Sequence, residues 1–141
     1  MNILASLTPK SDVDYITDEA TLFKAMQTLL NRNYSAIPII NKKGRYVGTI
    51  TAADILGCIK ENFDLSLKES ANFPVRNVHR TRDYKAIGVN TLMEGILEKA
   101  VDQNFVPVVD DEDNFIGILT RTEIMRWMRE KYNYDHPEGG N

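Results

Sequence analysis

Apolar and polar residues alternate along this chain in a pattern that occurs twice, and the first copy predicts two helices and two strands. The first helix is indicated by apolar residues at helical spacing, namely Leu22, Ala25, Met26, Leu29 and Leu30. Asp18 and Thr21 are candidate caps at its start. Two short apolar runs, 36–40 and 45–50, are expected to be strands on either side of a polar turn. A second helix is expected from Thr51. Its buried side is predicted to carry Ile55, Leu56 and Ile59.

The second copy has the same order of elements. Its first helix is indicated by Met93, Ile96, Leu97, Ala100 and Val101. Thr91 and Glu94 have the spacing of a capping box at the start of this helix. Strands are expected at 105–109 and 115–119, and a last helix begins at Thr120. The apolar residues of this helix suit either the core or the contact face of a dimer; they are Ile124, Met125, Trp127 and Met128.

The two copies are related by a nearly constant offset. Three pairs of residues lie 69 positions apart: Pro38 and Pro107, Gly48 and Gly117, and Thr51 and Thr120. Thr21 and Thr91 lie 70 apart, which predicts that the second copy has lost one residue between helix and strand. Such an offset indicates an internal duplication. One copy cannot cover its own apolar face, so we expect the two to pack together, with the function at their seam.

An extended stretch precedes the first helix of each copy, at 13–16 and 86–89, so the predicted unit is strand-helix-strand-strand-helix. The fold class is α/β (α+β), with two β-α-β-β-α repeats packed pseudo-symmetrically. We predict four segments, namely repeat 1 at 1–62, a linker at 63–82, repeat 2 at 83–132 and a flexible tail at 133–141. The linker is expected to pack, because it contains the apolar residues Leu65, Leu67, Phe73 and Val75. The tail is polar and rich in Gly and Pro.

Composition narrows the class of protein. The chain has 141 residues, of which 43% are hydrophobic and 26% charged, as in globular domains. The net charge of −3 gives no bulk attraction to nucleic acid or to an anionic membrane. Cys58 is the only cysteine, so an internal disulfide is excluded. The first residues lack the features of a signal peptide, and no run reaches the roughly 18 apolar residues of a membrane span. We therefore expect a cytoplasmic protein.

The candidate chemistry lies where a strand ending in Gly-x-x-Thr-x-x-acid runs into a helix, in both copies. The amides at a helix start are unpaired and favour anions. The threonine hydroxyl can donate to a phosphate, the carboxylate can accept hydrogen bonds from a ribose diol, and the glycine admits a ligand or the other repeat. The same spacing is also a plain helix-capping pattern. Capping and binding are compatible at such a site.

These paired motifs resemble tandem CBS domains (named for cystathionine β-synthase), which together form a Bateman module. The resemblance covers residues 8–131 and rests on the two segments Ala-Ile-Pro-Ile-Ile-Asn … Gly-Thr-Ile-Thr-Ala-Ala-Asp and Phe-Val-Pro-Val-Val-Asp … Gly-Ile-Leu-Thr-Arg-Thr-Glu. It implies adenosine-containing ligands in two clefts between the repeats, and a regulatory role, not a catalytic one.

The resemblance also implies which residues form each cleft. In one cleft, the phosphate and the ribose are expected to be bound by Thr51 and Asp54. The adenine of this cleft is expected to lie against Asn104, Phe105 and Val106, and the phosphates near Arg80, Thr81 and Arg82. The other takes Thr120, Arg121 and Glu123, with Tyr34, Ser35, Ala36 and Ile37 around the adenine and Lys10, Ser11, Asp12 and Val13 closing it. Glu123 replaces the aspartate of the family pattern, while Arg121 can grip phosphate bidentately. We therefore expect two clefts that are not equivalent.

The predicted function is a regulatory module that binds AMP, ADP or ATP and signals to an unknown target protein. Cyclic di-AMP and S-adenosylmethionine are the alternative ligands, and a dimeric interaction module with empty clefts is the alternative class. An enzyme is not expected, because the chain has no Gly-x-x-x-x-Gly-Lys loop, Gly-x-Ser-x-Gly elbow or Cys-x-x-Cys pair. His79 and His136 lack the spacing of metal ligands, and Cys58 falls in an apolar helical register. The leftover apolar residues of the last helix predict a homodimer, with Trp127 or Met128 near the contact.

Overall fold

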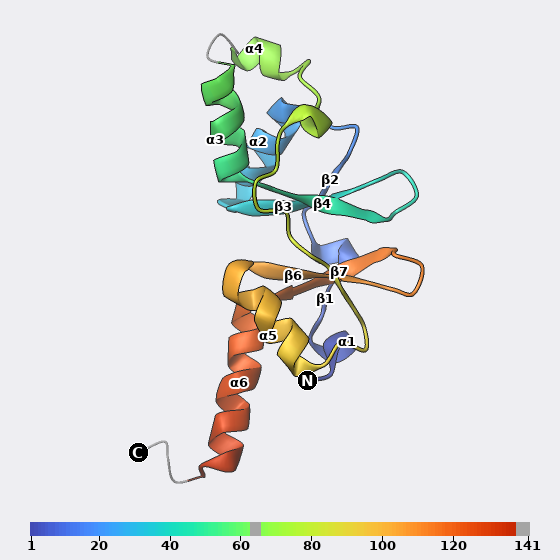
Figure 1. The fold of residues 1–141 in the computed structure, drawn as a ribbon, viewed down its shortest axis with the longest axis vertical. Coiled ribbons are helices and arrows are strands. Elements are labelled where there is room, and N and C mark those ends of the chain that lie inside the picture. Colours follow the sequence, from blue (N-terminus) through green and yellow to red (C-terminus); the bar gives the residue numbers. More distant parts are fainter. Residues whose placement is uncertain (63–65, 138–141) are drawn as a thin grey trace.

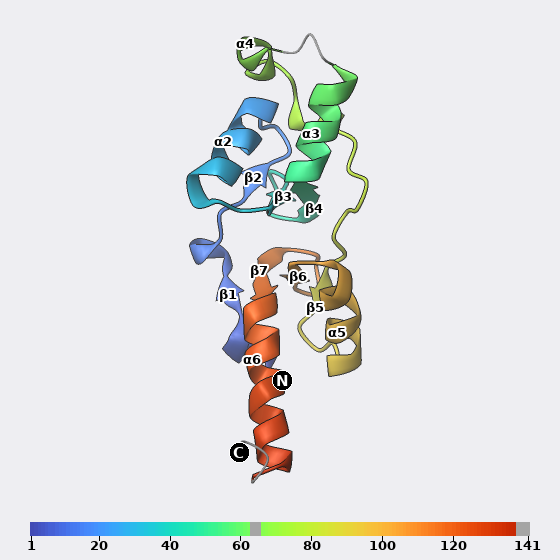
Figure 2. The same ribbon diagram turned by 90° about the vertical axis from the view of Figure 1, so that its left-hand side faces the viewer.

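The computed structural model describes residues 1–62 and 66–137, which form two stacked α/β units (Figure 1). In each unit one sheet lies toward the seam and the helices cover its outer face, and Figure 2 shows the same layering from the side. In chain order, the elements of residues 1–62 are α1 (Ile3–Ser6), β1 (Thr8–Pro9), the 3-10 turn η1 (Lys10–Asp12), β2 (Ile16–Thr17), α2 (Leu22–Arg32), β3 (Ala36–Ile40), β4 (Tyr46–Thr51) and α3 (Ala52–Glu61). The remaining elements are α4 (Leu67–Ser70), the 3-10 turn η2 (Val75–Asn77), β5 (Ile87–Gly88), α5 (Met93–Asp102), β6 (Phe105–Val109), β7 (Phe115–Thr120) and α6 (Arg121–Asp135). The predicted order strand-helix-strand-strand-helix is confirmed in both repeats.

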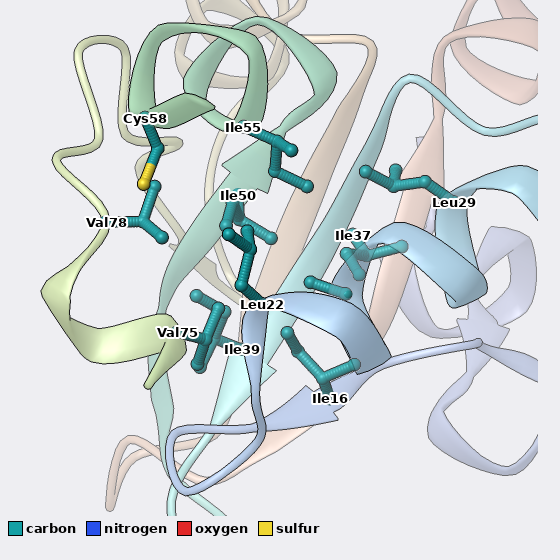
Figure 3. Packing of buried hydrophobic residues seen from close by; sticks show 11 residues of the cluster. Ile16, Leu22, Leu29, Ile37, Ile39, Ile50, Ile55, Cys58, Val75 and Val78 are labelled. Atoms are coloured by element: carbon teal, nitrogen blue, oxygen red, sulfur yellow. The ribbon is translucent and has the colours of Figure 1, made fainter. Parts of the chain in front are cut away.

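The first repeat has a three-stranded sheet in the order β2-β3-β4, on which α2 and α3 pack. Figure 3 shows its core, in which Leu22, Ile37 and Ile50 are completely buried. The Thr21 hydroxyl accepts a hydrogen bond from the Lys24 amide, so the predicted cap is confirmed. The prediction that Leu56 is buried is wrong, because Leu56 is 68% exposed. The buried face of α3 is formed instead by Asp54, Ile55 and Cys58. Leu30 of α2 is exposed in the same way.

The second repeat has a four-stranded sheet in the order β1-β7-β6-β5. Its edge strand β1 comes from the start of the chain and pairs antiparallel with β7, Thr8 opposite Ile118. Gly117 has φ +154°, and a Cβ there would collide with the carbonyl oxygen of Thr8, so β1 can approach only because residue 117 is glycine. Ile3 of α1 is buried in the core of this repeat. The start of the chain therefore completes the second repeat.

The capping box predicted from Thr91 and Glu94 is wrong. Helix α5 begins at Met93, with Leu92 as its N-cap and no side-chain cap, while the Thr91 hydroxyl donates to the Gly88 carbonyl at 2.8 Å. The N-caps Thr21 and Leu92 are 71 positions apart. The strands that precede these helices show the same offset. Ile16 and Ile87 are also 71 positions apart, whereas the residues with which they pair, Ile39 and Val108, are 69 apart. The second repeat is thus two residues shorter between helix and strand, not one, and Val101 of its helix is exposed.

Equivalent residues of the two repeats meet at the seam, as they do around a two-fold axis. The Asn104 side-chain amide donates to the Ser35 hydroxyl at 2.7 Å. Arg45 and Asn114 form an antiparallel bridge between the two hairpin turns. The rings of Tyr46 and Phe115 stack with their centroids 6.2 Å apart. Each of these pairs is 69 positions apart, so the seam follows the duplication.

The linker packs as predicted in the part that the structure describes. Phe73, Val75 and Val78 join the core of the first repeat, and the Phe73 carbonyl accepts a hydrogen bond from the Leu22 amide. Leu67 is exposed, and Leu65 lies outside the described residues.

Helix α6 extends away from the sheet at the lower end of the molecule (Figure 1). It continues to Asp135, three residues into the segment expected to be a flexible tail, and residues 138–141 lie outside the description. Of its apolar residues Ile124 is buried, Trp127 is half-buried, and Met125 and Met128 are exposed. Among the helices of the described residues, none combines the length and apolarity needed to cross a membrane.

Candidate functional site

Two cavities lie at the seam, one at the start of α3 and one at the start of α6. The Thr51 cavity has a volume of about 390 Å³ and is lined by Ser35, Thr51, Ala52, Ala53, Thr81, Arg82, Tyr84, Asp102 and Asn104. The Thr120 cavity has a volume of about 260 Å³ and is lined by Thr8, Asp12, Val13, Asp14, Tyr34, Ser35, Ala36, Pro38, Asn104, Phe105, Ile118 and Thr120. Ser35 and Asn104 line both, so their hydrogen bond forms the wall between the two cavities.

Both helix starts are built in the same way. The hydroxyls of Thr51 and Thr120 cap their helices by accepting from the amides of Asp54 and Glu123, each at 3.1 Å. The next amide in each helix, that of Ala52 or Arg121, donates to the carbonyl of Ser35 or Asn104. Each helix N-terminus is thereby held against the strand that carries the cavity wall.

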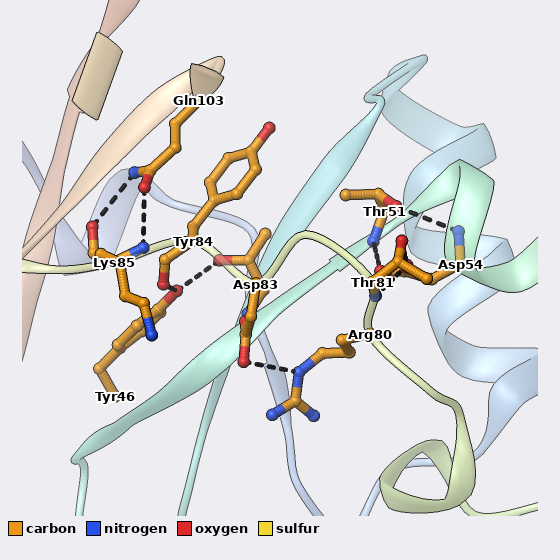
Figure 4. A network of polar contacts seen from close by, with 10 residues as sticks. Tyr46, Thr51, Asp54, Arg80, Thr81, Asp83, Tyr84, Lys85 and Gln103 are labelled. Atoms are coloured by element: carbon orange, nitrogen blue, oxygen red, sulfur yellow. Dashed lines mark hydrogen bonds and ion pairs between the residues drawn. The ribbon is translucent and has the colours of Figure 1, made fainter. Parts of the chain in front are cut away.

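Asp54 is fully engaged by the protein. Its carboxylate accepts hydrogen bonds from the Thr51 amide at 3.0 Å and from the Thr81 amide and hydroxyl, both at 3.1 Å (Figure 4). The hydrogen bond from the Thr51 amide, together with the one that the Asp54 amide donates to the Thr51 hydroxyl, forms a capping box, as the capping interpretation predicted. Asp54 is only 3% exposed and lines a small hollow of about 90 Å³ beside Cys58, not the Thr51 cavity. Thr81 faces the Thr51 cavity in its place.

The end of the linker is held on the first repeat by Asp83, the residue that directly follows it. This carboxylate accepts from the Thr49 amide at 2.7 Å and pairs with the Arg80 guanidinium at 3.1 Å (Figure 4). A Cβ on Gly48 would lie 2.6 Å from an Asp83 carboxylate oxygen, so this glycine admits the linker. In this structure the two motif glycines thus make room for the linker and for β1.

The residues that follow Asp83, namely Tyr84 and Lys85, are held by the body of the second repeat. The buried side chain of Gln103 accepts from the Lys85 amide at 2.8 Å and donates to the Lys85 carbonyl at 3.1 Å. Tyr84 accepts at its hydroxyl from the Asn104 amide, and its ring packs edge-on against Phe105 with centroids 4.9 Å apart. The Tyr84 carbonyl accepts from the hydroxyl of Tyr46, whose pKa is raised well above its ordinary value by burial. The end of the linker and the residues that follow it therefore bridge both repeats along the Thr51 cavity.

The Thr120 cavity has a different charge. Asp12 and Asp14 line it, and the Tyr34 hydroxyl donates to Asp14 at 3.1 Å across its edge. Among the described residues that line this cavity there is no Lys or Arg. Arg121 turns away and donates to the carbonyls of Ala100 and Gln103 at the end of α5. Carboxylates suit hydroxyl groups and not phosphates, so the two cavities differ chemically.

The structure brings together most of the residues that the sequence assigned to a site. Those that line a cavity are Asp12, Val13, Tyr34, Ser35, Ala36, Thr51, Thr81, Arg82, Asn104, Phe105 and Thr120. Phe105, however, lines the Thr120 cavity and not the Thr51 cavity to which the sequence assigned it. Those that do not line either cavity are Lys10, Ser11, Ile37, Asp54, Arg80, Val106, Arg121 and Glu123. Ile37 and Val106 are completely buried in the sheets, and Glu123 pairs with Arg126 on the surface of α6.

Several lining residues were not predicted, namely Thr8, Pro38, Asp14, Ile118, Ala52, Ala53, Tyr84 and Asp102. Thr8 and Ile118 reach the site because β1 pairs with β7. The position of Tyr84 could have been predicted from the sequence, because an aromatic residue that closely follows a basic segment suits the rim of a nucleotide site. The position of Asp102 could not, because it is the last residue of a helix with many exposed charges.

The thiol of Cys58 is placed as its apolar helical register suggested. Cys58 is 6% exposed in the core of the first repeat, and burial raises the pKa of its thiol. Across residues 1–62 and 66–137, no three His, Cys, Asp or Glu side chains are grouped so that they could hold a metal ion.

Comparison with known proteins adds the following findings. The family model of the CBS domain matches the chain twice, at residues 4–61 and 75–130. The gamma subunit of the 5'-AMP-activated protein kinase of Saccharomyces cerevisiae is 26% identical over 137 residues, covering 85% of this chain and 41% of the yeast protein. The crystal structure of CbpB in complex with c-di-AMP is similar with a TM-score of 0.81 and 27% identity, covering 98% of this chain and 91% of that one.

A second CbpB in complex with c-di-AMP, from Listeria monocytogenes, is 25% identical with a TM-score of 0.79, covering 95% of this chain and 99% of that one. In contrast, the chain spans less than half the length of the curated relatives that it matches first.

Proposed function

The chain belongs to the CBS domain family, and we propose that its two repeats form a regulatory module that binds an adenine nucleotide at their seam. The observation that carries this proposal is the pair of cavities in equivalent positions, each at a helix start capped by the motif threonine. The volume of the Thr51 cavity lies in the range of about 300–1,000 Å³ that small-molecule sites occupy.

The Thr51 cavity is the proposed site for the phosphate. Arg82 supplies a guanidinium, Thr81 a hydroxyl, and Ala52 and Ala53 belong to the first turn of α3, where the helix dipole favours an anion. Asn104 is expected beside the adenine. Asp54 reaches a ribose only if it releases Thr81, so in the structure as described its contribution to the site is to position Thr81.

The Thr120 cavity is proposed to hold an adenosine group through its base and ribose. Phe105, Ala36 and Ile118 give it an apolar wall, and Tyr34 gives it an aromatic edge. Asp12 and Asp14 can accept hydrogen bonds from ribose hydroxyls. Without a cation from the described lining residues, this cavity is expected to bind a phosphorylated ligand more weakly than the Thr51 cavity.

AMP, ADP and ATP remain the first proposed ligands, and cyclic di-AMP is a second candidate with its own support. The yeast relative is the gamma subunit of a 5'-AMP-activated protein kinase, and two CbpB structures at 27% and 25% identity contain c-di-AMP. Cyclic di-AMP carries two adenosines and two phosphates, which a pair of adjoining cavities could accommodate together.

We also propose that the module is a homodimer and transmits its liganded state to a target protein without catalysis of its own. Met125 is 62% exposed on α6, and its equivalent Leu56 on α3 is exposed to a similar degree. Such apolar side chains on the outer helices suit an interface.

Calorimetric titration with adenosine, AMP, ATP, cyclic di-AMP and S-adenosylmethionine tests the proposed ligand class. AMP or cyclic di-AMP is expected to bind, and at 100 times its dissociation constant to stabilise the fold by about 2.7 kcal/mol. Arg82→Ala should weaken AMP about tenfold or more and leave adenosine unchanged, because a hydrogen bond to a charged group contributes roughly 1.5–3 kcal/mol. Arg76→Ala, an exposed linker arginine outside both cavities, is the matched control. The absence of binding by every adenine nucleotide would refute the proposal and favour a module without ligand.

A further inference from the structure

A further hollow adjoins the Thr51 cavity beside the end of α5. It has a volume of about 440 Å³ and is lined by Arg82, Asp83, Tyr84, Lys85, Glu98, Lys99, Asp102 and Gln103. We call it the outer hollow. Arg82, Tyr84 and Asp102 line both the outer hollow and the Thr51 cavity, so the two spaces join along these three residues. Neither repeat motif points to this hollow.

We propose that the outer hollow is a second phosphate subsite, in which Lys85 and Lys99 hold a phosphate beyond the one at Arg82. This inference rests on the proposed function of the Thr51 cavity. A phosphate beside Arg82 stands at the boundary of the two spaces, and the next group of the ligand then enters the outer hollow. The chemical class is an adenine nucleotide with more than one phosphate.

The charge of the outer hollow supports this assignment. Asp83 is already neutralised by Arg80 and by the Thr49 amide. That leaves the three cations Arg82, Lys85 and Lys99 against the two carboxylates Glu98 and Asp102. In the part of the chain that the structure describes, these five side chains form no ion pair within 4.0 Å. The lysines are therefore available to a phosphate, for which an ammonium is a strong partner.

The end of α5 would normally disfavour an anion here, because the last carbonyls of a helix carry negative partial charge. Arg121 removes this obstacle by donating from its guanidinium to the carbonyls of Ala100 and Gln103. This gives Arg121 an indirect role at the outer hollow, in place of the phosphate contact predicted for it in the Thr120 cavity.

The wall of the outer hollow is also rigidly held, as a binding site requires. Both the amide and the carbonyl of Lys85 are bound by the buried Gln103 side chain (Figure 4). Tyr84 is buried and is held through its carbonyl by Tyr46 and through its hydroxyl by the Asn104 amide. The segment that presents Arg82 and Lys85 is thus fixed from both repeats.

The test is a titration of the full chain with AMP, ADP, ATP and cyclic di-AMP in magnesium-free buffer. The double variant Lys85→Gln with Lys99→Gln keeps a polar side chain at each position and removes both charges. It should weaken ADP and ATP about tenfold and leave AMP and cyclic di-AMP within about twofold. Lys24→Gln, an exposed lysine on α2, is the matched control and should change none of them. Equal melting temperatures of the variants establish that they are folded.

The outcomes separate the two proposals. If AMP binds and the double variant weakens AMP as much as ATP, or weakens neither, the subsite is refuted while the nucleotide site stands. If ADP and ATP bind the unmodified chain no more tightly than AMP, the subsite is likewise refuted. If no adenine nucleotide binds at all, the proposed function itself fails, and the subsite with it.

Discussion

Replacing Asp54 with alanine should destabilise this protein far more than replacing its equivalent in the other repeat, Glu123. Asp54 is buried and accepts three hydrogen bonds, one from the Thr51 amide and two from Thr81 of the linker. Glu123 stands 69 positions later, at the same place in its helix, but its carboxylate pairs with Arg126 on a partly exposed surface. The duplication therefore provides a natural control.

The magnitude follows from these contacts. Loss of the capping box at the start of α3 costs about 1 kcal/mol, and loss of the two part-buried hydrogen bonds that Thr81 donates to the Asp54 carboxylate costs about a further 1–3 kcal/mol. We expect Asp54→Ala to lower the free energy of unfolding by about 2–4 kcal/mol. The Glu123–Arg126 pair is a surface pair of neighbouring helical turns, so Glu123→Ala should cost only about 0.5 kcal/mol. At roughly 4 °C per kcal/mol, the melting temperatures should fall by about 8–16 °C and by about 2 °C.

Urea unfolding and calorimetric melting without ligand measure both variants. Thr81→Val keeps the Thr81 amide and removes only the hydroxyl donor. It should lower the free energy of unfolding by about 1 kcal/mol, a loss between those of Glu123→Ala and Asp54→Ala. Equal losses for Asp54→Ala and Glu123→Ala would refute the reasoning, because they would mean that the tie between α3 and the linker contributes nothing.

Three further predictions concern other parts of the fold. Gly117→Ala should cost about 3 kcal/mol in urea unfolding, because its Cβ collides with the Thr8 carbonyl, while Gly88→Ala, which has open space, should cost little. The folded chain should resist alkylation of Cys58 at pH 8, because the thiol is buried. Burial also raises the pKa of this thiol above the unfolded value of 9.0, so the stability linked to the thiol is present below pH 9 and is lost as the pH rises above it. Light scattering should give twice the chain mass of 16.0 kDa, and Met128→Glu should shift it to the monomer; a monomer without the substitution contradicts the proposed dimer.

The order of elements could be predicted because each local signal agreed with the others. The Thr21 and Thr51 caps, the apolar strands and the constant offset after the helix all depend on residues close in sequence. The partner of β1 could not be predicted, since two residues, Thr8 and Pro9, carry no pattern that distinguishes one sheet from the other. The exact offset of α5 was missed because Thr91 offered a better cap than Leu92, which the structure uses.

The positions of the two cavities could be predicted from the repeated motif, but the orientation of its charged side chains could not. Asp54 and Arg121 fit a ligand site by spacing alone. In the structure their partners are the Thr81 donors and the Ala100 carbonyl, which come from distant parts of the chain. Long side chains find the nearest unsatisfied backbone group, and that group is set by tertiary packing.

The most direct test of the nucleotide site is an amide NMR titration of the uniformly ¹⁵N-labelled chain with AMP and with cyclic di-AMP. The account predicts saturable shifts at the amides that line the Thr51 cavity, led by Ala52, Thr81 and Arg82, with Asn104 responding because it lines the wall between the cavities. Amides of the exposed part of α6 beyond Met128 should stay unchanged if only the seam is occupied. Saturable shifts confined to α6, or no shifts at millimolar nucleotide, would contradict the claim that this seam binds an adenine nucleotide.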